Sequence, residues 1–558
     1  MEKLVKINYK NQIIKEFPKD TEVSVIAKEF QKDYMYDILI ARVNNRFMEL
    51  SDAISKDCDI DFYDRSSKLG NDVYDRSIQF ILVLAVKRLF GKNAEVLIEH
   101  SMDKGIYCEL PDIETNKKVV QQLEEEMKKI VAEDLIFTKM SVSRIDAISF
   151  FEKKKRFDKS ESLRYISNTY INLYRLDDVY DYFYGEMAYS TKSINSFALT
   201  YIAGNGFVVS FPNATNPEVT LPYTHHQMLF DKFLDYTKWG RIINIKNITD
   251  LNKVTMVGRY NDLIQLAESH YDSQLALIAD QIYEESDHVK LVLCAGASSS
   301  GKTTTASKLG LYLRSKGLRP HLISLDNYFK NRKDTPVLPN GELDLESLDA
   351  VDVNLFNKHL IQLLDGEKVL LPEYNFIKGE REYHNNWLKI EKNDVIVIEG
   401  LHCLNDELTL SIERRRKFKI YISPLTQINI DNHNRIHTTD IRKLRRIVRD
   451  NRHRGYNAGA TLKHWEEIRK GEEKYIFPFQ DDIDVIFNTA LLYEIAVLKT
   501  YVEPLLYSVS EEDEMYYEAI RLINLLREVL PMPSEGVPRD SVLREFIGDI
   551  RYIQEWER

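Results

Sequence analysis

The chain has few cysteines, and they form no recognisable pattern. Its 558 residues include four, Cys58, Cys108, Cys294 and Cys403, which are far apart and contain no C-x-x-C pair. This spacing is not that of a disulfide framework. We therefore expect free thiols in a reducing compartment.

Long apolar runs and an excess of positive charge are also missing. The longest apolar run, residues 78–86, is interrupted by Gln79 and is too short to cross a bilayer. The first residues, M-E-K-L-V-K-I, lack the apolar region of a secretion signal. A net charge of -11 argues against a protein that coats nucleic acid or a membrane surface. We expect a cytoplasmic protein with no membrane partner.

The most specific motif lies in residues 289–306, V-K-L-V-L-C-A-G-A-S-S-S-G-K-T-T-T-A. A short apolar run predicts a buried strand, a glycine-bounded loop follows, and a helical pattern comes next. This is G-x-x-x-x-G-K-[ST] in the setting of a phosphate-binding loop. Its amides and the helix N-terminus attract an anion, whereas a chance Gly/Ser-rich turn would need neither flanking element. The predicted nucleotide-binding residues are Gly296, Ala297, Ser298, Ser299, Ser300, Gly301, Lys302, Thr303 and Thr304.

Two carboxylates follow predicted strands near this loop. Asp326 follows the second strand, at the end of a sheet where ligands bind in α/β proteins. Glu399 ends the apolar strand D-V-I-V-I-E-G, which is the Walker-B position. Asp326 can accept a proton, bind Mg²⁺, or do both. We predict that Thr303, Asp326 and Glu399 surround Mg²⁺. The alternative is two ordinary acids at strand ends.

Residues 435–454 contain eight Lys or Arg and only two Asp. On a helix, Arg442, Arg445 or Arg446, and Arg449 share a face. Arginines on one helix face suit a lid that closes over transferring phosphates. The alternatives are a solvated basic face and an RNA contact.

Residues from about 290 to 490 resemble the uridine kinase branch of the phosphoribulokinase-like P-loop kinases. Five segments carry the likeness: G-A-S-S-S-G-K-T-T, L-D-N-Y-F, L-P-E-Y-N-F, I-V-I-E-G-L and R-R-I-V-R-D-N-R-H-R-G. The resemblance implies ATP or GTP as donor, Mg²⁺ as cofactor, and Asp326 as the base that takes a proton from a sugar 5′-hydroxyl. It also implies that Lys302 binds the triphosphate. The lid arginines would be Arg446, Arg449 and Arg454.

The same resemblance implies a set of substrate-binding residues. Tyr374 and Phe376 match base-contacting aromatics, Glu346 matches a sugar-binding acid, and Tyr328 lies in the L-D-N-Y-F segment. Three positions depart from the family pattern, because Asn375 replaces an Asp, Gly379 a base-reading His, and Tyr456 a lid Arg. Recognition of a pyrimidine is therefore left open.

The N-terminal half resembles parts of threonyl-tRNA synthetases. Residues 2–62, with V-N-N-R-F-M-E-L followed by a strand, are similar to a TGS domain, and residues 67–240 are similar to the editing-type domain. The H-x-x-x-H metal pair of that domain is absent, since the helix reads Asp75-Arg76-Ser77-Ile78-Gln79. The resemblance thus implies no metal site there. RNA contact by these domains remains an alternative, but nucleic acid is not required.

These inferences predict an α/β P-loop kinase whose parallel sheet is covered by helices on both faces, preceded by two α+β domains. The expected units are residues 1–66, 67–240, a helical linker 241–287, the kinase 288–500, and C-terminal helices 501–558. The expected reaction is Mg-dependent transfer from ATP or GTP to the 5′-hydroxyl of a uridine- or cytidine-like nucleoside. The alternatives are a kinase for another small alcohol and an RNA-responsive nucleotide-binding regulator. We also expect a homo-oligomer.

Overall fold

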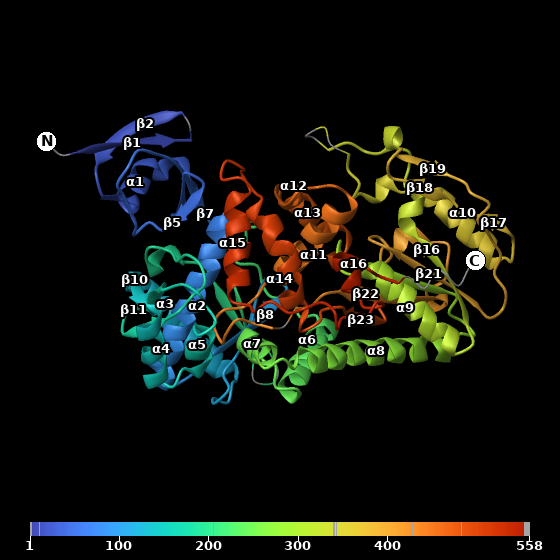
Figure 1. Cartoon of the computed structure of the whole chain (residues 1–558), viewed down its shortest axis with the longest axis horizontal. Helices are drawn as coiled ribbons and strands as arrows, with labels where there is room; N and C mark the ends of the chain where they lie inside the picture. Colours follow the sequence, from blue (N-terminus) through green and yellow to red (C-terminus); the bar gives the residue numbers. More distant parts are fainter. Residues whose placement is uncertain are drawn as a thin grey trace.

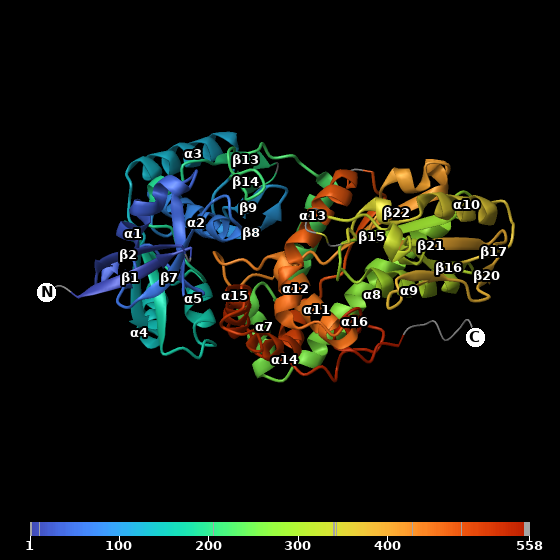
Figure 2. The ribbon, with the colours of Figure 1, turned by 90° about the horizontal axis from the view of Figure 1, so that it is seen from above.

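The computed structural model describes residues 3–10, 12–202, 204, 206–338, 341, 343–426, 428–480 and 482–551. Figure 1 shows the N-terminal sheet and the second unit at one end and the P-loop unit at the other, with helices between them. Figure 2 gives the same arrangement from above. No helix among the described residues has both the length and the apolar character needed to cross a membrane.

The first unit is a five-stranded sheet with one helix packed against it. Its strand order is β2-β1-β7-β4-β5. Alternate residues of β1 are buried, as expected for a strand with one face on a core. The elements are β1 (Leu4–Tyr9), β2 (Ile13–Pro18), β3 (Thr21–Glu22), α1 (Val23–Phe30), β4 (Ile38–Val43), β5 (Arg46–Met48), β6 (Ala53–Ile54) and β7 (Cys58–Asp64).

The second unit is built around α2 (Lys68–Phe90). Residues 77–86 of this helix are all buried, which explains why its sequence is apolar on every side. Two sheets, β10-β11-β12 and β13-β14-β9-β8, belong to this unit. The other elements are β8 (Leu97–Met102), β9 (Gly105–Glu109), α3 (Lys117–Ala132), β10 (Thr138–Ser143), α4 (Arg144–Lys153), α5 (Phe157–Ser162), β11 (Tyr170–Leu176), β12 (Val179–Asp181), β13 (Ala198–Ile202), β14 (Gly206–Ser210) and α6 (Gln227–Ile242).

The P-loop unit contains a five-stranded parallel sheet in the order β16-β21-β15-β22-β23. The strands are β15 (Leu291–Gly296), β16 (Arg319–Ser324), β21 (Asp394–Gly400), β22 (Lys417–Ser423) and β23 (Val485–Asn488). The helices are α9 (Lys302–Ser315), α10 (Val353–Leu364), α11 (Thr438–His453), α12 (Ala458–Lys463) and α13 (Trp465–Tyr475), and β17 (Val369–Leu370), β18 (Glu373–Asn375), β19 (Glu380–Glu382) and β20 (Trp387–Leu388) form small hairpins.

Helices cover both faces of this sheet, which confirms the predicted fold class. Val292 and Cys294 of β15 lie in one hydrophobic cluster with α9 and α11. Leu291 and Leu293 lie in another, with α10 and α6. This division follows from the alternation of side chains along a strand.

The helices at the two ends of the P-loop unit share its core. α7 (Ile248–Met256) and α8 (Tyr260–Glu284) pack in the same cluster as α14 (Glu494–Tyr507), α15 (Tyr516–Arg527) and α16 (Arg544–Ile547). The boundary predicted between residues 500 and 501 therefore falls inside α14. The cause is long-range packing, because these helices cover the same face of the sheet as α9.

Candidate functional site

Two positions in the loop between β15 and α9 require glycine. A Cβ atom at Gly296 would lie 2.2 Å from the carbonyl oxygen of Ile422 on the adjacent strand. Gly301 begins α9 with φ of 84°, in the left-handed region. The glycines that bound the motif are thus explained by close approach and by backbone conformation.

Several polar groups of this loop have no strong protein partner. The side-chain oxygens of Ser299 and Ser300 are buried and lack a hydrogen-bond partner in the part of the chain that the structure describes. Lys302 Nζ donates to the carbonyl oxygen of Ala297, at 3.2 Å. Buried hydroxyls need partners, and the N-terminus of α9 favours an anion. These features fit a bound phosphate chain.

The two predicted acids meet beside Lys302. β16 and β21 pair so that Ser324 lies opposite Glu399, and the Ser324 hydroxyl donates to Glu399 Oε1 at 2.7 Å. Burial and the nearby charge of Asp326 raise the pKa of Glu399 to about 7, although Lys302 acts against this. Loss of hydration likewise raises the pKa of Asp326, against the charges of Lys302, Arg454 and Arg449. The Asp326 residue is nevertheless accessible to solvent.

This donor set fits Mg²⁺ shared with a nucleotide. Asp326 and Glu399 offer carboxylate oxygens and Thr303 a hydroxyl, which are the hard oxygen ligands that Mg²⁺ takes. No cluster of three or more His, Cys, Asp or Glu suited to a metal occurs in the described ranges. A few protein oxygens that act together with substrate phosphates are the usual arrangement for Mg²⁺ in kinases.

Three arginines at the end of α11 share a single acid. Arg446 Nε lies 3.0 Å, Arg449 Nη2 2.9 Å and Arg454 Nε 3.7 Å from the carboxylate of Asp450. Arg446 Nη1 also donates to Ser298 Oγ at 2.5 Å, so this set reaches the phosphate loop. Burial, and then the charges of Arg449 and Arg454, lower the pKa of Arg446 to about 10. Positive charge therefore exceeds negative charge here.

Two other arginines of α11, Arg442 and Arg445, pair with residues of the protein, which differs from the lid predicted for this helix face. Arg442 pairs with buried Glu472 and donates to the backbone of Ser298. Arg445 is fully buried, and its guanidinium contacts Glu494 and the Thr489 carbonyl oxygen, the latter at 2.8 Å. These two side chains hold the phosphate loop and the end of the sheet together, since Thr489 Oγ1 also donates to the Ser300 carbonyl oxygen. The helical pattern alone does not separate them from Arg446 and Arg449.

The predicted substrate residues divide into three groups. Burial raises the pKa of Glu346, and the charges of Arg446 and Lys302 act against this. Phe376 is exposed and packs with its ring centroid 5.0 Å from that of the buried Tyr374. Tyr328 instead lies in the core, with its hydroxyl oxygen 3.1 Å from His359 Nδ1. Its side chain packs on Phe356 of α10.

Sequence reasoning missed two acids near this site. Asp450 lies within the arginine run, and its isolation among eight cations was a usable signal. Glu545 of α16 accepts a hydrogen bond from Thr304 Oγ1 at 2.7 Å. It lies 241 residues away in the chain, and nothing in its local sequence indicates the contact.

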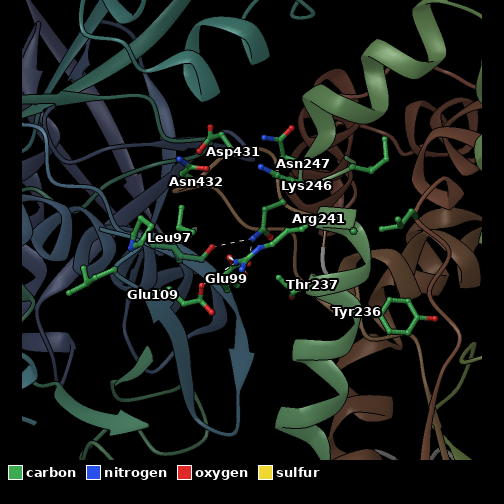
Figure 3. A pocket seen from close by; sticks show the side chains of 17 residues that line it. Leu97, Glu99, Glu109, Tyr236, Thr237, Arg241, Lys246, Asn247, Asp431 and Asn432 are labelled. Atoms are coloured by element: carbon green, nitrogen blue, oxygen red, sulfur yellow. Dashed lines mark hydrogen bonds and ion pairs between the residues drawn. The ribbon is translucent and has the colours of Figure 1, made fainter. Parts of the chain in front are cut away.

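A separate cavity of about 470 Å³ lies between the strands β8 and β9 and the helix α6 (Figure 3). Arg241 of α6 bridges Glu99 and Glu109 across it, at 3.4 and 3.1 Å. Burial and the charge of Glu109 raise the pKa of Glu99 to about 7. None of the predicted site residues lines this cavity.

Comparisons with known proteins match the P-loop unit and the N-terminal region to different families. A family model described as the Phosphoribulokinase / Uridine kinase family matches residues 291–495. The uridine kinase of Mycoplasma genitalium is 35% identical over 178 residues, which cover 32% of this chain and 74% of that protein. The uridine kinase of Halobacterium salinarum is 28% identical over 193 residues, 34% of this chain and 76% of that protein.

The N-terminal region matches a different enzyme. The threonine–tRNA ligase of Carboxydothermus hydrogenoformans is 30% identical over 203 residues, which are 36% of this chain and 32% of that protein. The chain therefore spans about a third of the length of this relative. The likeness is to one part of the ligase.

Proposed function

The chain belongs to the phosphoribulokinase/uridine kinase family, and from this premise we propose that it transfers the terminal phosphoryl group of ATP or GTP to the 5′-hydroxyl of a nucleoside. The observation that carries the proposal is the unbalanced cluster at the phosphate loop. Glu399 and Asp326 have raised pKa values, and Arg446 and Arg454 have lowered ones. Burial is the largest cause of each of these shifts. Poorly hydrated acids and arginines around one loop suit a site that takes a polyphosphate and a metal ion.

Each residue then has a distinct part in the transfer. Lys302 and the amides at the start of α9 bind the donor phosphates. Asp326 accepts the proton of the acceptor hydroxyl. The hydroxyl oxygen bonds to the terminal phosphorus of the donor, and the bond between that phosphorus and the leaving nucleoside diphosphate breaks. Arg446, Arg449 and Arg454 stabilise charge on the transferring group. Mg²⁺, held by Thr303, Asp326 and Glu399, would supply charge neutralisation at the phosphates.

The acceptor site is the less specific part of the proposal. The charges of Arg446 and Lys302 act on Glu346. Its carboxylate is suited to accept hydrogen bonds from sugar hydroxyls. Phe376 and Tyr374 offer an aromatic surface for a base. Asn375 and Gly379, which differ from the family pattern, leave the choice of base to experiment.

A panel of nucleosides and small alcohols, each with ATP or GTP and Mg²⁺, tests the proposal through acceptor-dependent release of nucleoside diphosphate. We expect turnover with uridine or cytidine and its loss in a Lys302→Met variant. Transfer only to alcohols that are not nucleosides would reassign the acceptor. Binding of RNA without turnover on any acceptor would favour a regulator, a candidate suggested by the ligase-like region.

A further inference from the structure

Residues 538–548, called here the 538–548 segment, lie against the phosphate loop. In Figures 1 and 2 its helix α16 lies between α11 and α9. A Cβ atom built on Gly301 would lie 2.3 Å from Cγ2 of Val542, so this valine touches the loop backbone. The ring of Phe546 lies 5.1 Å from the guanidinium carbon of Arg445. The segment thus covers the start of α9 on the side of α11.

Polar contacts hold the segment in register along α8 and α9. Asp540 pairs with Lys308 at 3.1 Å, and the buried Ser541 hydroxyl donates to Glu268 at 2.6 Å. Val542, Leu543 and Phe546 are buried between these helices and α11. The buried residues before and after Glu545 therefore fix its position.

The position of Glu545 conflicts with nucleotide binding. Its Oε2 atom accepts the Thr304 hydroxyl at 2.7 Å, in the first turn of α9. The positive end of that helix is where a donor phosphate binds. A carboxylate and a phosphate cannot both occupy this place without repulsion.

We infer that the 538–548 segment makes an autoinhibitory contact. In this contact Glu545 accepts the hydrogen bond of the Thr304 hydroxyl and competes with the donor phosphates for the N-terminus of α9. The inference rests on the proposed function, since it concerns regulation of the same site. The donor must displace the Glu545 side chain, or the whole segment, to reach the loop. Whatever pulls the segment away would then activate the kinase.

Calorimetric titration with MgATP in the absence of an acceptor tests this inference on the full chain. Glu545→Gln removes the charge and keeps the shape, and we expect it to lower the Kd for MgATP by about fivefold or more, because one anion at a helix N-terminus is removed. Magnesium tripolyphosphate, which has no ribose or base, should show the same gain. Asp549→Asn is the matched control, since Asp549 is an exposed acid of the same region that pairs with Arg539.

The outcomes separate the inference from the function on which it rests. Equal or weaker MgATP binding by Glu545→Gln, with the control unchanged, overturns the autoinhibitory contact and leaves the kinase proposal standing. Absence of MgATP binding in every variant refutes the nucleotide site, and the inference with it. Hydrogen exchange on the unaltered chain is the second measurement. MgATP should increase exchange in the 538–548 segment, and protection there would contradict displacement.

Discussion

Two clusters of charged residues in this molecule have opposite shifts in the pKa of their carboxyl groups. In the second unit, Lys159 is fully buried between Asp181, at 3.0 Å, and Asp431, at 2.8 Å. His433 Nδ1 lies 2.5 Å from Asp181. Although burial opposes it, the charges of Lys159 and His433 hold the pKa of Asp181 well below its usual value. At the phosphate loop, by contrast, Asp326 and Glu399 have raised pKa values.

The difference separates a structural cluster from a ligand site. In the first cluster Lys159 pairs with both acids and His433 pairs with Asp181, so the network links the segment before α11 to the second unit. In the second cluster burial outweighs the charge of Lys302 at both Asp326 and Glu399, and in this sense the cluster is unbalanced. Perturbed pKa values cluster at functional sites, and a charge partner supplied by the protein separates the structural case from the functional one.

The largest expected effect is on catalysis by the unbalanced cluster. Asp326→Asn removes the proposed base, so we expect kcat to fall by about 10³-fold while MgATP still binds. Asp334→Asn, a change at an exposed acid of the same unit, is the control and should keep full activity. Turnover by Asp326→Asn within tenfold of the unaltered chain would mean that another group takes the proton.

A change in the cluster around Lys159 should instead lower the stability of the fold. Lys159→Met leaves Asp181 and Asp431 without their shared buried cation, so we expect the free energy of unfolding to fall by about 3–5 kcal/mol. A lower urea midpoint would report this, while kcat of the folded protein should change less than twofold. Lys153→Met, at an exposed lysine of α4, is the control. A loss of kcat without a loss of stability would place Lys159 in the catalytic machinery.

The smallest expected effect is a dependence of metal binding on pH. Because the pKa of Glu399 is raised to about 7, its metal-binding carboxylate form dominates only above that pH. Affinity for Mg²⁺ should therefore increase about tenfold from pH 6 to pH 8, as the proton no longer competes. A titration of the nucleotide complex measures this, with Glu399→Gln as the control for titration of the nucleotide itself. The same slope in both proteins would exclude Glu399 as the titrating ligand.

Much of the P-loop unit could be predicted from local sequence. The strand–loop–helix around Lys302 and the strand that ends at Glu399 are each continuous in the chain, so their patterns are visible without tertiary contacts. Asp326 follows a strand, and parallel strands bring such ends to one edge. The spacing predicts that Arg442, Arg445 or Arg446, and Arg449 share one helix face. It does not predict that Arg445 is buried, because that burial depends on the distant Glu494.

The sequence by itself determined the phosphate loop, the two acids at strand ends and the arginine-rich helix, since each depends on spacing within a short stretch of chain. Only the tertiary structure decided which arginines serve the fold, where Tyr328 points, and that Glu545 meets Thr304. Those outcomes depend on how distant elements pack, and a contact across 241 residues leaves no periodic trace in the sequence around either partner.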